Sequence, residues 1–122
     1  MKIAVTSKGT ELTSEVDPRF ARARYFIVVD TESDVFQAID NEQNVNAAHG
    51  AGPQAAQKIA EAEVEALLSG NVGPRAFAAL NAAGIKVYIG AEGTVAEAAE
   101  QFKAGKLQAA DDANVGGHGA SR

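Results

Sequence analysis

Three arginines lie within six residues of an acidic chain, and their side chains suit the recognition of an anion. The segment reads Arg19-Phe20-Ala21-Arg22-Ala23-Arg24, whereas the chain of 122 residues has a formal net charge of −5. The planar guanidinium group presents several N–H donors and can bind an anion at two points. The segment therefore predicts an anion-binding surface. The alternative is that Arg22 and Arg24 are solvated residues at the edge of a strand.

Two further segments could hold an anion through backbone N–H groups. Ala48-His49-Gly50-Ala51-Gly52 and Asn71-Val72-Gly73-Pro74 each precede a predicted helix. The free N–H groups and the positive end of the dipole at a helix N-terminus attract negative charge. His49 adds a ring nitrogen that can donate a hydrogen bond or bind a metal. These residues are candidates for the site, although the glycines also suit ordinary turns and a loop histidine need have no role.

The residue types exclude several kinds of chemistry. The chain has no cysteine, which excludes disulfides, a thiol nucleophile, thiolate zinc sites and ordinary cysteine-bound iron–sulfur clusters. It contains neither the glycine-rich phosphate-binding loop nor the nucleophile-elbow motif. A two-metal nuclease needs carboxylates on its central strand, and Ile3-Ala4-Val5-Thr6 provides none. We interpret Glu61, Glu63 and Glu65 as solvated residues near a helix end, and we expect no enzymatic activity.

Length and charge indicate one soluble domain without nucleic-acid or membrane partners. A chain of this length supports one core, and an acidic surface does not favour binding to phosphate backbones. No apolar run approaches the ~20 residues of a membrane span, and the opening MKIAVTS does not resemble a secretion signal. We therefore expect a cytoplasmic protein in which residues 1–105 form the domain. Residues 106–122, which include His118, are expected to form a flexible glycine-rich tail.

Hydrophobic patterning predicts strands and helices in the order β-β-β-α-β-α-β-α. Helices are expected to begin at Pro53 and Pro74, because proline suits the first turn, and after Thr94, which can cap an N-terminus. Residues 7–23 and 41–52 are predicted loops, and long loops in compact domains are commonly functional. Short apolar or β-branched runs predict strands at residues 2–6, 25–30, 35–40, 64–68 and 85–89.

This order predicts a ribonuclease-H-like three-layer α/β fold, with a mixed five-stranded sheet and helices on both faces. The first strand would be central, and the carboxyl ends of four strands would meet at one edge, where open α/β sheets bind ligands. The loops at this edge would bring together several basic or titratable side chains: Lys8, Arg19, Arg22, Arg24, His49 and Arg75.

Several motifs in combination resemble the dinitrogenase iron–molybdenum cofactor biosynthesis family. They are the opening MKIAVTS, residues 17–23 (DPRFARA) leading into YFIVVD, the loop at residues 48–52 and the turn at residues 71–74. The resemblance covers about residues 1–105. Within the family, the chain is most similar to small stand-alone proteins of sulfate-reducing bacteria that carry a molybdenum–copper–sulfide cluster without cysteine ligands. Many relatives have glycine where this chain has Ala21.

The resemblance implies a non-catalytic carrier of an anionic metal–sulfur cluster. The cluster would be molybdenum–copper–sulfide or, alternatively, a precursor of the iron–molybdenum cofactor. Because the chain lacks cysteine, a preformed cluster with its own sulfide is favoured over an iron–sulfur precursor. Phe20 would provide an apolar wall, and His49 is both a cluster-binding residue and the candidate metal ligand. The other implied cluster-binding residues are Arg19, Arg22, Gly50, Gly52, Asn71, Val72, Gly73 and Pro74.

A function of a different class remains open. The same edge, or the alanine-rich helices, could dock a protein partner such as an ATPase, which would make the protein an interaction or regulatory module without a cluster. A third interpretation, a small phosphate- or sulfate-binding enzyme, is weaker because no base or nucleophile accompanies the anion site.

Overall fold

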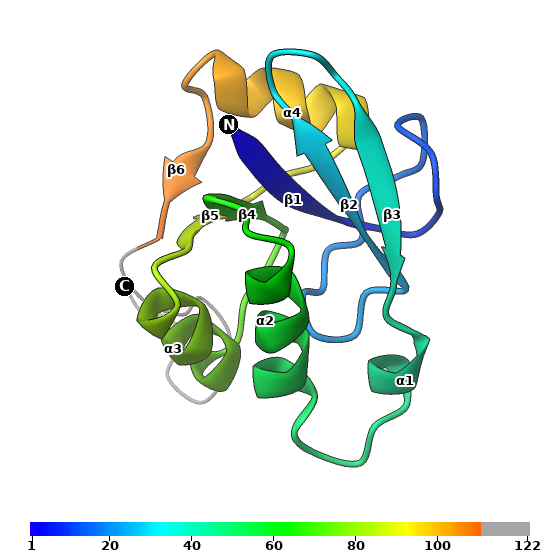
Figure 1. The fold of residues 1–122 in the computed structure, drawn as a ribbon, viewed down its shortest axis with the longest axis vertical. Coiled ribbons are helices and arrows are strands. Elements are labelled where there is room, and N and C mark those ends of the chain that lie inside the picture. The colour runs from blue at the N-terminus through cyan, green and yellow to red at the C-terminus, as the bar shows by residue number, and fades with distance from the viewer. Residues whose placement is uncertain (111–122) are drawn as a thin grey trace.

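The computed structural model describes residues 1–110, which form one mixed sheet with helices on both faces (Figure 1). The strands lie side by side in the order β3-β2-β1-β4-β5-β6. Their bounds are β1 (Lys2–Ser7), β2 (Tyr25–Asp30), β3 (Phe36–Asp40), β4 (Ala66–Leu68), β5 (Lys86–Ile89) and β6 (Gln108–Ala109). The helices are α1 (Glu42–Val45), α2 (Ala51–Glu61), α3 (Pro74–Ala82) and α4 (Val95–Lys103).

Strand β1 is central because it pairs on both sides. It is antiparallel to β2, with Val5 opposite Ile27, and parallel to β4, with Val5 opposite Leu68. Strand β4 is parallel to β5, and β2 is antiparallel to β3. The carboxyl ends of β1, β3, β4 and β5 therefore lie at the same edge of the sheet, as the sequence predicted. We call this edge, with the loops at residues 8–24, 41–50, 69–73 and 90–94, the carboxyl edge.

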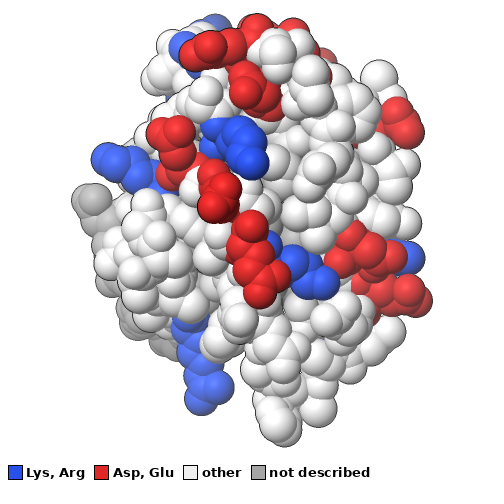
Figure 2. Space-filling model, in the orientation of Figure 1, with Lys and Arg blue, Asp and Glu red and all other residues white. Residues whose placement is uncertain are grey.

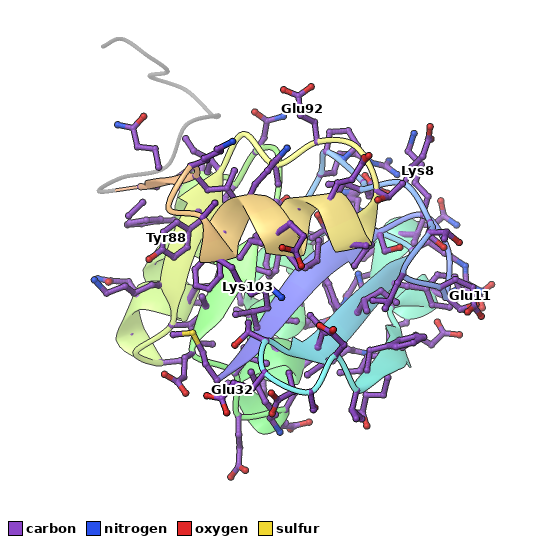
Figure 3. All side chains as sticks on the ribbon, turned by 90° about the horizontal axis from the view of Figure 1, so that it is seen from above. Lys8, Glu11, Glu32, Tyr88, Glu92 and Lys103 are labelled. Carbon is purple, nitrogen blue, oxygen red and sulfur yellow. The ribbon has the colours of Figure 1, made fainter. Side chains whose placement is uncertain are left out.

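Apolar side chains alternate along the strands and form a core on each face of the sheet. One core includes Phe26 and Ile59 and lies under α2 and α3. The other includes Ile27 and Val95 and lies under α4, which Figure 3 shows lying across the sheet. Because both faces are covered, β2 is an almost continuous apolar run.

The helices begin near the positions that the sequence predicted, with one correction. Helix α2 begins at Ala51 rather than Pro53, because Gly50 adopts a left-handed conformation (φ 80°) and forms its N-cap. Pro53 still lies in the first turn, where its missing N–H has no helical partner to lose. Helix α3 begins at Pro74, and Thr94 caps α4, as predicted. Within the described part of the chain, no helix is long and apolar enough to cross a membrane.

The sheet has six strands, whereas the sequence predicted five. Strand β6 pairs antiparallel with β5, and the N–H of Ala110 donates to the carbonyl of Val87 at 2.8 Å. A strand of two exposed residues has no hydrophobic periodicity in the sequence. It is recognised only by its pairing with β5 in the structure. It belongs to the segment that the sequence predicted to be a tail. The rest of that segment, residues 111–122 with His118, lies outside the described residues.

Candidate anion-binding site

Buried hydrogen bonds fix the first loop of the carboxyl edge to the central strands. The N–H of Asp17 donates to the carbonyl of Thr6 at 3.0 Å, and Thr6 Oγ1 donates to the carbonyl of Asp17 at 2.6 Å. Thr6 Oγ1 also lies 3.1 Å from Ser69 Oγ at the end of β4. All three residues are buried. The loop after β1 is therefore held at the ends of both parallel strands.

The turn at Pro18 lies directly on the loop that follows β4. The N–H of Asn71 donates to the carbonyl of Pro18 at 2.7 Å. A Cβ on Gly70 would lie 2.9 Å from both the Cα and the carbonyl oxygen of Pro18. Position 70 therefore needs glycine because two backbone segments approach closely. The same contact places Arg19 beside Asn71, with which it forms a parallel bridge.

Arg19 forms a two-point ion pair with Asp17. Its Nε and Nη2 atoms donate to Oδ1 and Oδ2 of Asp17, both at 3.1 Å, and its backbone N–H donates to Oδ1 at 3.0 Å. The Asp17 side chain is 2% exposed, whereas that of Arg19 is 59% exposed. The hydrogen bond from Arg19 and the negative charge of Asp17 raise the pKa of Arg19. The guanidinium is thus present at the carboxyl edge, but its charge is largely compensated.

The charged side chain of Arg22 donates hydrogen bonds to backbone carbonyls. Its Nη1 atom donates to the carbonyl oxygens of Asn44, Val45 and Ala47, at 3.1, 3.3 and 2.7 Å. These carbonyls lie at and just beyond the end of α1, where a positive charge is favourable. Arg22 therefore has partners inside the protein.

Helix α1 lies in a segment that the sequence predicted to be a loop. A helix of four residues is not stable alone, and two buried amides hold this one in place. Asn41 Nδ2 donates to the carbonyls of Ala21 and Ala23, at 3.0 and 2.8 Å. Asn44 Nδ2 donates to Asn41 Oδ1 at 2.8 Å. These tertiary contacts leave no periodic signal in the sequence.

Arg24 also has partners of its own. It forms salt bridges with Asp40 at 2.8 Å and Glu42 at 3.5 Å, and its guanidinium lies 4.5 Å from the centre of the Tyr25 ring. The arginines that the sequence grouped together therefore each pair within the protein, and they do not form one open cationic surface.

The first turns of α2 and α3 lie side by side at the carboxyl edge. Gly52, the second residue of α2, is so close to α3 that a Cβ there would lie 3.2 Å from the N atom of Ala76. No side chain caps either helix, and neither has an acidic residue in its first turn. By contrast, Thr94 and Glu97 form a complete capping box on α4. Two positive helix ends therefore meet, with N–H groups that no side chain satisfies.

Arg75 adds an unpaired charge at this point. It is the second residue of α3 and is exposed, and its side chain forms no ion pair or hydrogen bond within residues 1–110. Residues 43–60 and 66–91, which contain most of α2 and all of α3 with the preceding loops, contain no Asp or Glu. On the face shown in Figure 2, the end of the molecule where the loop from α1 enters α2 (Figure 1) carries no acidic surface. The charge of Arg75 is therefore not offset by any carboxylate within these two segments, although the protein is acidic.

The other predicted residues divide between the edge and the core. His49 is exposed in the loop before α2 and has no hydrogen bond within the described residues. Gly50 and Gly73 are the N-caps of α2 and α3. Phe20 is 2% exposed and stacks on Phe26 with the ring centres 5.5 Å apart. It therefore supports the edge from within the core rather than facing the solvent.

Val72 is also a core residue, 1% exposed. Asn71 and Pro74, the first and last residues of this predicted turn, are exposed. Lys8, the remaining cation that was expected at this edge, lies 3.5 Å from Glu15.

Within residues 1–110, no group of three or more His, Cys, Asp or Glu residues could hold a metal ion. His49 would therefore be an isolated metal ligand.

Sequence reasoning did not assign roles to the buried polar residues of the edge. These residue types are common in loops, so composition alone gives no signal, although Asp17 was part of the segment that resembles the family. The residues that position the edge without being predicted to do so are Thr6, Asp17, Asn41, Asn44 and Ser69.

A comparison of the sequence with models of known protein families identifies the family of this chain. The model of the family described as dinitrogenase iron-molybdenum cofactor matches residues 1–105. The chain belongs to this family. The match spans every element described above except β6.

This member of the dinitrogenase iron–molybdenum cofactor family is similar to several known proteins over most of its length. It is 44% identical to the orange protein from Desulfovibrio gigas, whose apo form has a TM-score of 0.91 over 93% of this chain and 96% of that one. It is also 44% identical to a NifB-like protein from Thermotoga, with a TM-score of 0.78 over 88% and 91% of the two chains. An uncharacterized protein of Methanocaldococcus jannaschii is 31% identical over 110 residues, which are 88% of this chain and 90% of that protein.

Proposed function

We propose that this protein binds and carries an anionic metal–sulfur cluster at the carboxyl edge, by charge and N–H donors rather than by covalent protein ligands. One observation carries the proposal: the adjacent, uncapped N-termini of α2 and α3 and the unpaired Arg75 belong to two segments, residues 43–60 and 66–91, that contain no Asp or Glu. The cofactor for which the family is described supports a cargo of this class.

An anion would stabilise this edge in two ways. It would accept hydrogen bonds from the first-turn N–H groups, and it would relieve the repulsion between the two helix ends and Arg75. A single charge at one helix end contributes only about 0.3–1 kcal/mol at an exposed position. A small monovalent anion would therefore be held weakly. A multiply charged cluster that contacts both helix ends and Arg75 would gain several such contributions.

The available donors suit a cluster that brings its own sulfur. The chain offers no thiolate, and His49 is the one imidazole among the described residues. A molybdenum–copper–sulfide cluster meets this requirement, and a precursor of the iron–molybdenum cofactor is the alternative cargo. Exposed small or apolar residues beside the helix ends, such as Ala48, Pro53 and Pro74, suit a polarisable sulfide surface.

The edge supports carriage rather than catalysis. Ser69 is buried, and its hydroxyl lies within a network with Thr6 and the carbonyl of Asn71. The Asp17 carboxylate is occupied by Arg19. Neither group forms the nucleophile and base pair that covalent or acid–base catalysis requires. We therefore propose a non-enzymatic role.

The test is retention of a cluster by the purified apo-protein. The protein is mixed with tetrathiomolybdate and a copper salt and desalted, and protein-bound molybdenum and copper are measured with the visible spectrum. Wild-type protein should stay coloured and hold molybdenum in a fixed ratio. Absence of both would refute the proposal, and a metal-free protein that co-purifies with a partner from its native source would favour the interaction module instead.

A matched pair of variants tests where the cluster binds. Arg75→Gln and Lys86→Gln each remove one exposed cation that has no ion pair within residues 1–110, but only Arg75 lies at the carboxyl edge. Arg75→Gln should lower retention several-fold, while Lys86→Gln should leave it unchanged. Equal losses would mean that net charge, rather than this edge, controls binding.

A further inference from the structure

Arg22 joins two loops of the carboxyl edge through a single nitrogen atom. Its Nη1 atom donates to three carbonyl oxygens, all from residues 44–47. The side chain is half-buried, and it forms no ion pair with a carboxylate among the described residues. Its charge is thus directed at the backbone of another loop.

The loop that Arg22 contacts also donates hydrogen bonds to the segment around Arg22. Asn41 donates its amide hydrogens to the carbonyls of Ala21 and Ala23, on either side of Arg22. Each loop therefore supplies a side chain that satisfies backbone carbonyls of the other. We call this reciprocal arrangement of Arg22 and Asn41 the loop clasp.

The clasp acts on the segment that enters α2. Helix α1 has no basic residue in its last turn, so Arg22 supplies the positive charge that favours a helix C-terminus. The chain continues from the last of these carbonyls, on Ala47, through the exposed His49 to Gly50, the left-handed N-cap of α2. The position of His49 and the start of α2 therefore depend on where the clasp holds Ala47.

We infer that Arg22 is a positioning residue of the carboxyl edge: it fixes the loop that carries His49, and its guanidinium does not contact the cargo. The effect on cargo binding rests on the proposed function, whereas the effect on the loop does not. In this respect Arg22 differs from Arg75, whose charge has no partner within residues 1–110.

Hydrogen exchange of the apo-protein tests the loop without any ligand. The N–H groups of Asn46 and Ala47 both donate to the carbonyl of Asn44, which Arg22 also contacts. In Arg22→Gln these amides should exchange about tenfold faster, because a charge-assisted hydrogen bond is lost. Lys86→Gln, which removes an exposed cation without an ion pair within residues 1–110, should leave them unchanged. Unchanged exchange in Arg22→Gln, with an unchanged urea midpoint, would overturn the inference.

Arg22→Lys separates geometry from charge. Lysine keeps the positive charge but has a shorter reach and a compact head group, so it should not hold all of the carbonyls. If Arg22 positions the loop, Arg22→Lys should lose cluster retention nearly as strongly as Arg22→Gln. If Arg22 instead acts on the cargo through its charge, Arg22→Lys should retain the cluster, and the inference fails.

A double-mutant cycle with His49→Ala tests whether Arg22 acts through this loop. Arg22→Gln should lower retention about tenfold alone but should add little to His49→Ala, because residues that act as one unit are not additive. Arg75→Gln combined with His49→Ala should be closer to additive. Additivity for Arg22 would overturn the inference. If wild-type protein retains no cluster, the proposed function fails, and the exchange experiment still decides whether the clasp exists.

Discussion

Arg19 and Asp17 form an ion pair in which the carboxylate is buried and the guanidinium is exposed. The pair spans the turn at Pro18, whose carbonyl accepts a hydrogen bond from the loop after β4. The buried charge therefore holds the turn in shape and fixes the direction of Arg19, while the exposed half of the pair remains at the carboxyl edge.

Replacing the buried carboxylate should weaken the whole turn. Asp17→Asn keeps one oxygen acceptor but loses the charge that Arg19 contacts at two points. We expect a loss of about 1–3 kcal/mol in the free energy of unfolding, measured by urea denaturation at neutral pH. Glu15→Gln is the matched control, because Glu15 is exposed and its pair with Lys8 is long. An equal loss in both variants would contradict a special role for Asp17.

Gly70→Ala should destabilise the protein through a backbone collision. The new Cβ would lie 2.9 Å from the Cα and carbonyl oxygen of Pro18, and neither atom can move without shifting the turn. Overpacking of this kind costs about 1–3 kcal/mol, which should appear as a lower urea midpoint. A midpoint equal to that of the wild type would show that the two loops separate easily.

Unlike Gly70→Ala, Gly52→Ala should lower cluster retention more than it lowers the free energy of unfolding. Alanine favours a helix interior over glycine by about 1 kcal/mol, and the smaller gain at this first-turn position partly offsets the crowding of a Cβ placed 3.2–3.4 Å from Ala76. The first turns of α2 and α3 must then move apart, so cluster retention should fall. Unchanged retention would show that the spacing of the two helix ends is unimportant.

Phe20 should matter for stability and little for the choice of cargo. Phe20→Ala removes a fully buried ring that stacks on Phe26, and such a change costs about 3–5 kcal/mol. Phe20→Leu should keep most of the fold and retain the cluster like the wild type. Loss of the cluster from a well-folded Phe20→Leu protein would restore the interpretation of this ring as a binding wall.

Acid should destabilise the protein through its aspartates. The N–H groups of Glu32 and Ser33 lower the pKa of Asp30, and the N–H of Glu42 lowers that of Asp40. The folded protein therefore binds fewer protons than the unfolded chain in acid, so stability is lost as the pH falls below the ordinary aspartate pKa of about 3.9. Urea midpoints measured across this range should fall less steeply in Asp30→Asn. The same slope in that variant would contradict the assignment.

The elements that define the carboxyl edge were predictable where local sequence determines structure. The apolar run YFIVVD predicted β2, Pro74 predicted the start of α3, and Thr94 predicted the cap of α4. The parallel ends of the strands followed from the order of elements. These signals depend on residues close together in the chain, which is why one sequence was enough.

The partners of the charged residues could not be predicted in this way. The sequence shows Arg19, Arg22 and Arg24 as one cationic group, but the fold brings a carboxylate or a carbonyl to each of them. Helix α1 and strand β6 were missed for a related reason, because both are too short to be stable without tertiary contacts. Arg75 was placed at the edge, but its lack of a partner within residues 1–110 became evident only from the structure.

The contact between Gly52 and Ala76 also bears on how easily a cargo could be accepted and released. The first turns of α2 and α3 are held together at the level of the backbone, and buried residues behind them, such as Ala55 and Leu80, belong to the core. The donors are therefore in place before anything binds, so little conformational entropy is lost on association. Under the proposed function, no covalent bond would have to be broken on release, which suits the carriage of a cargo.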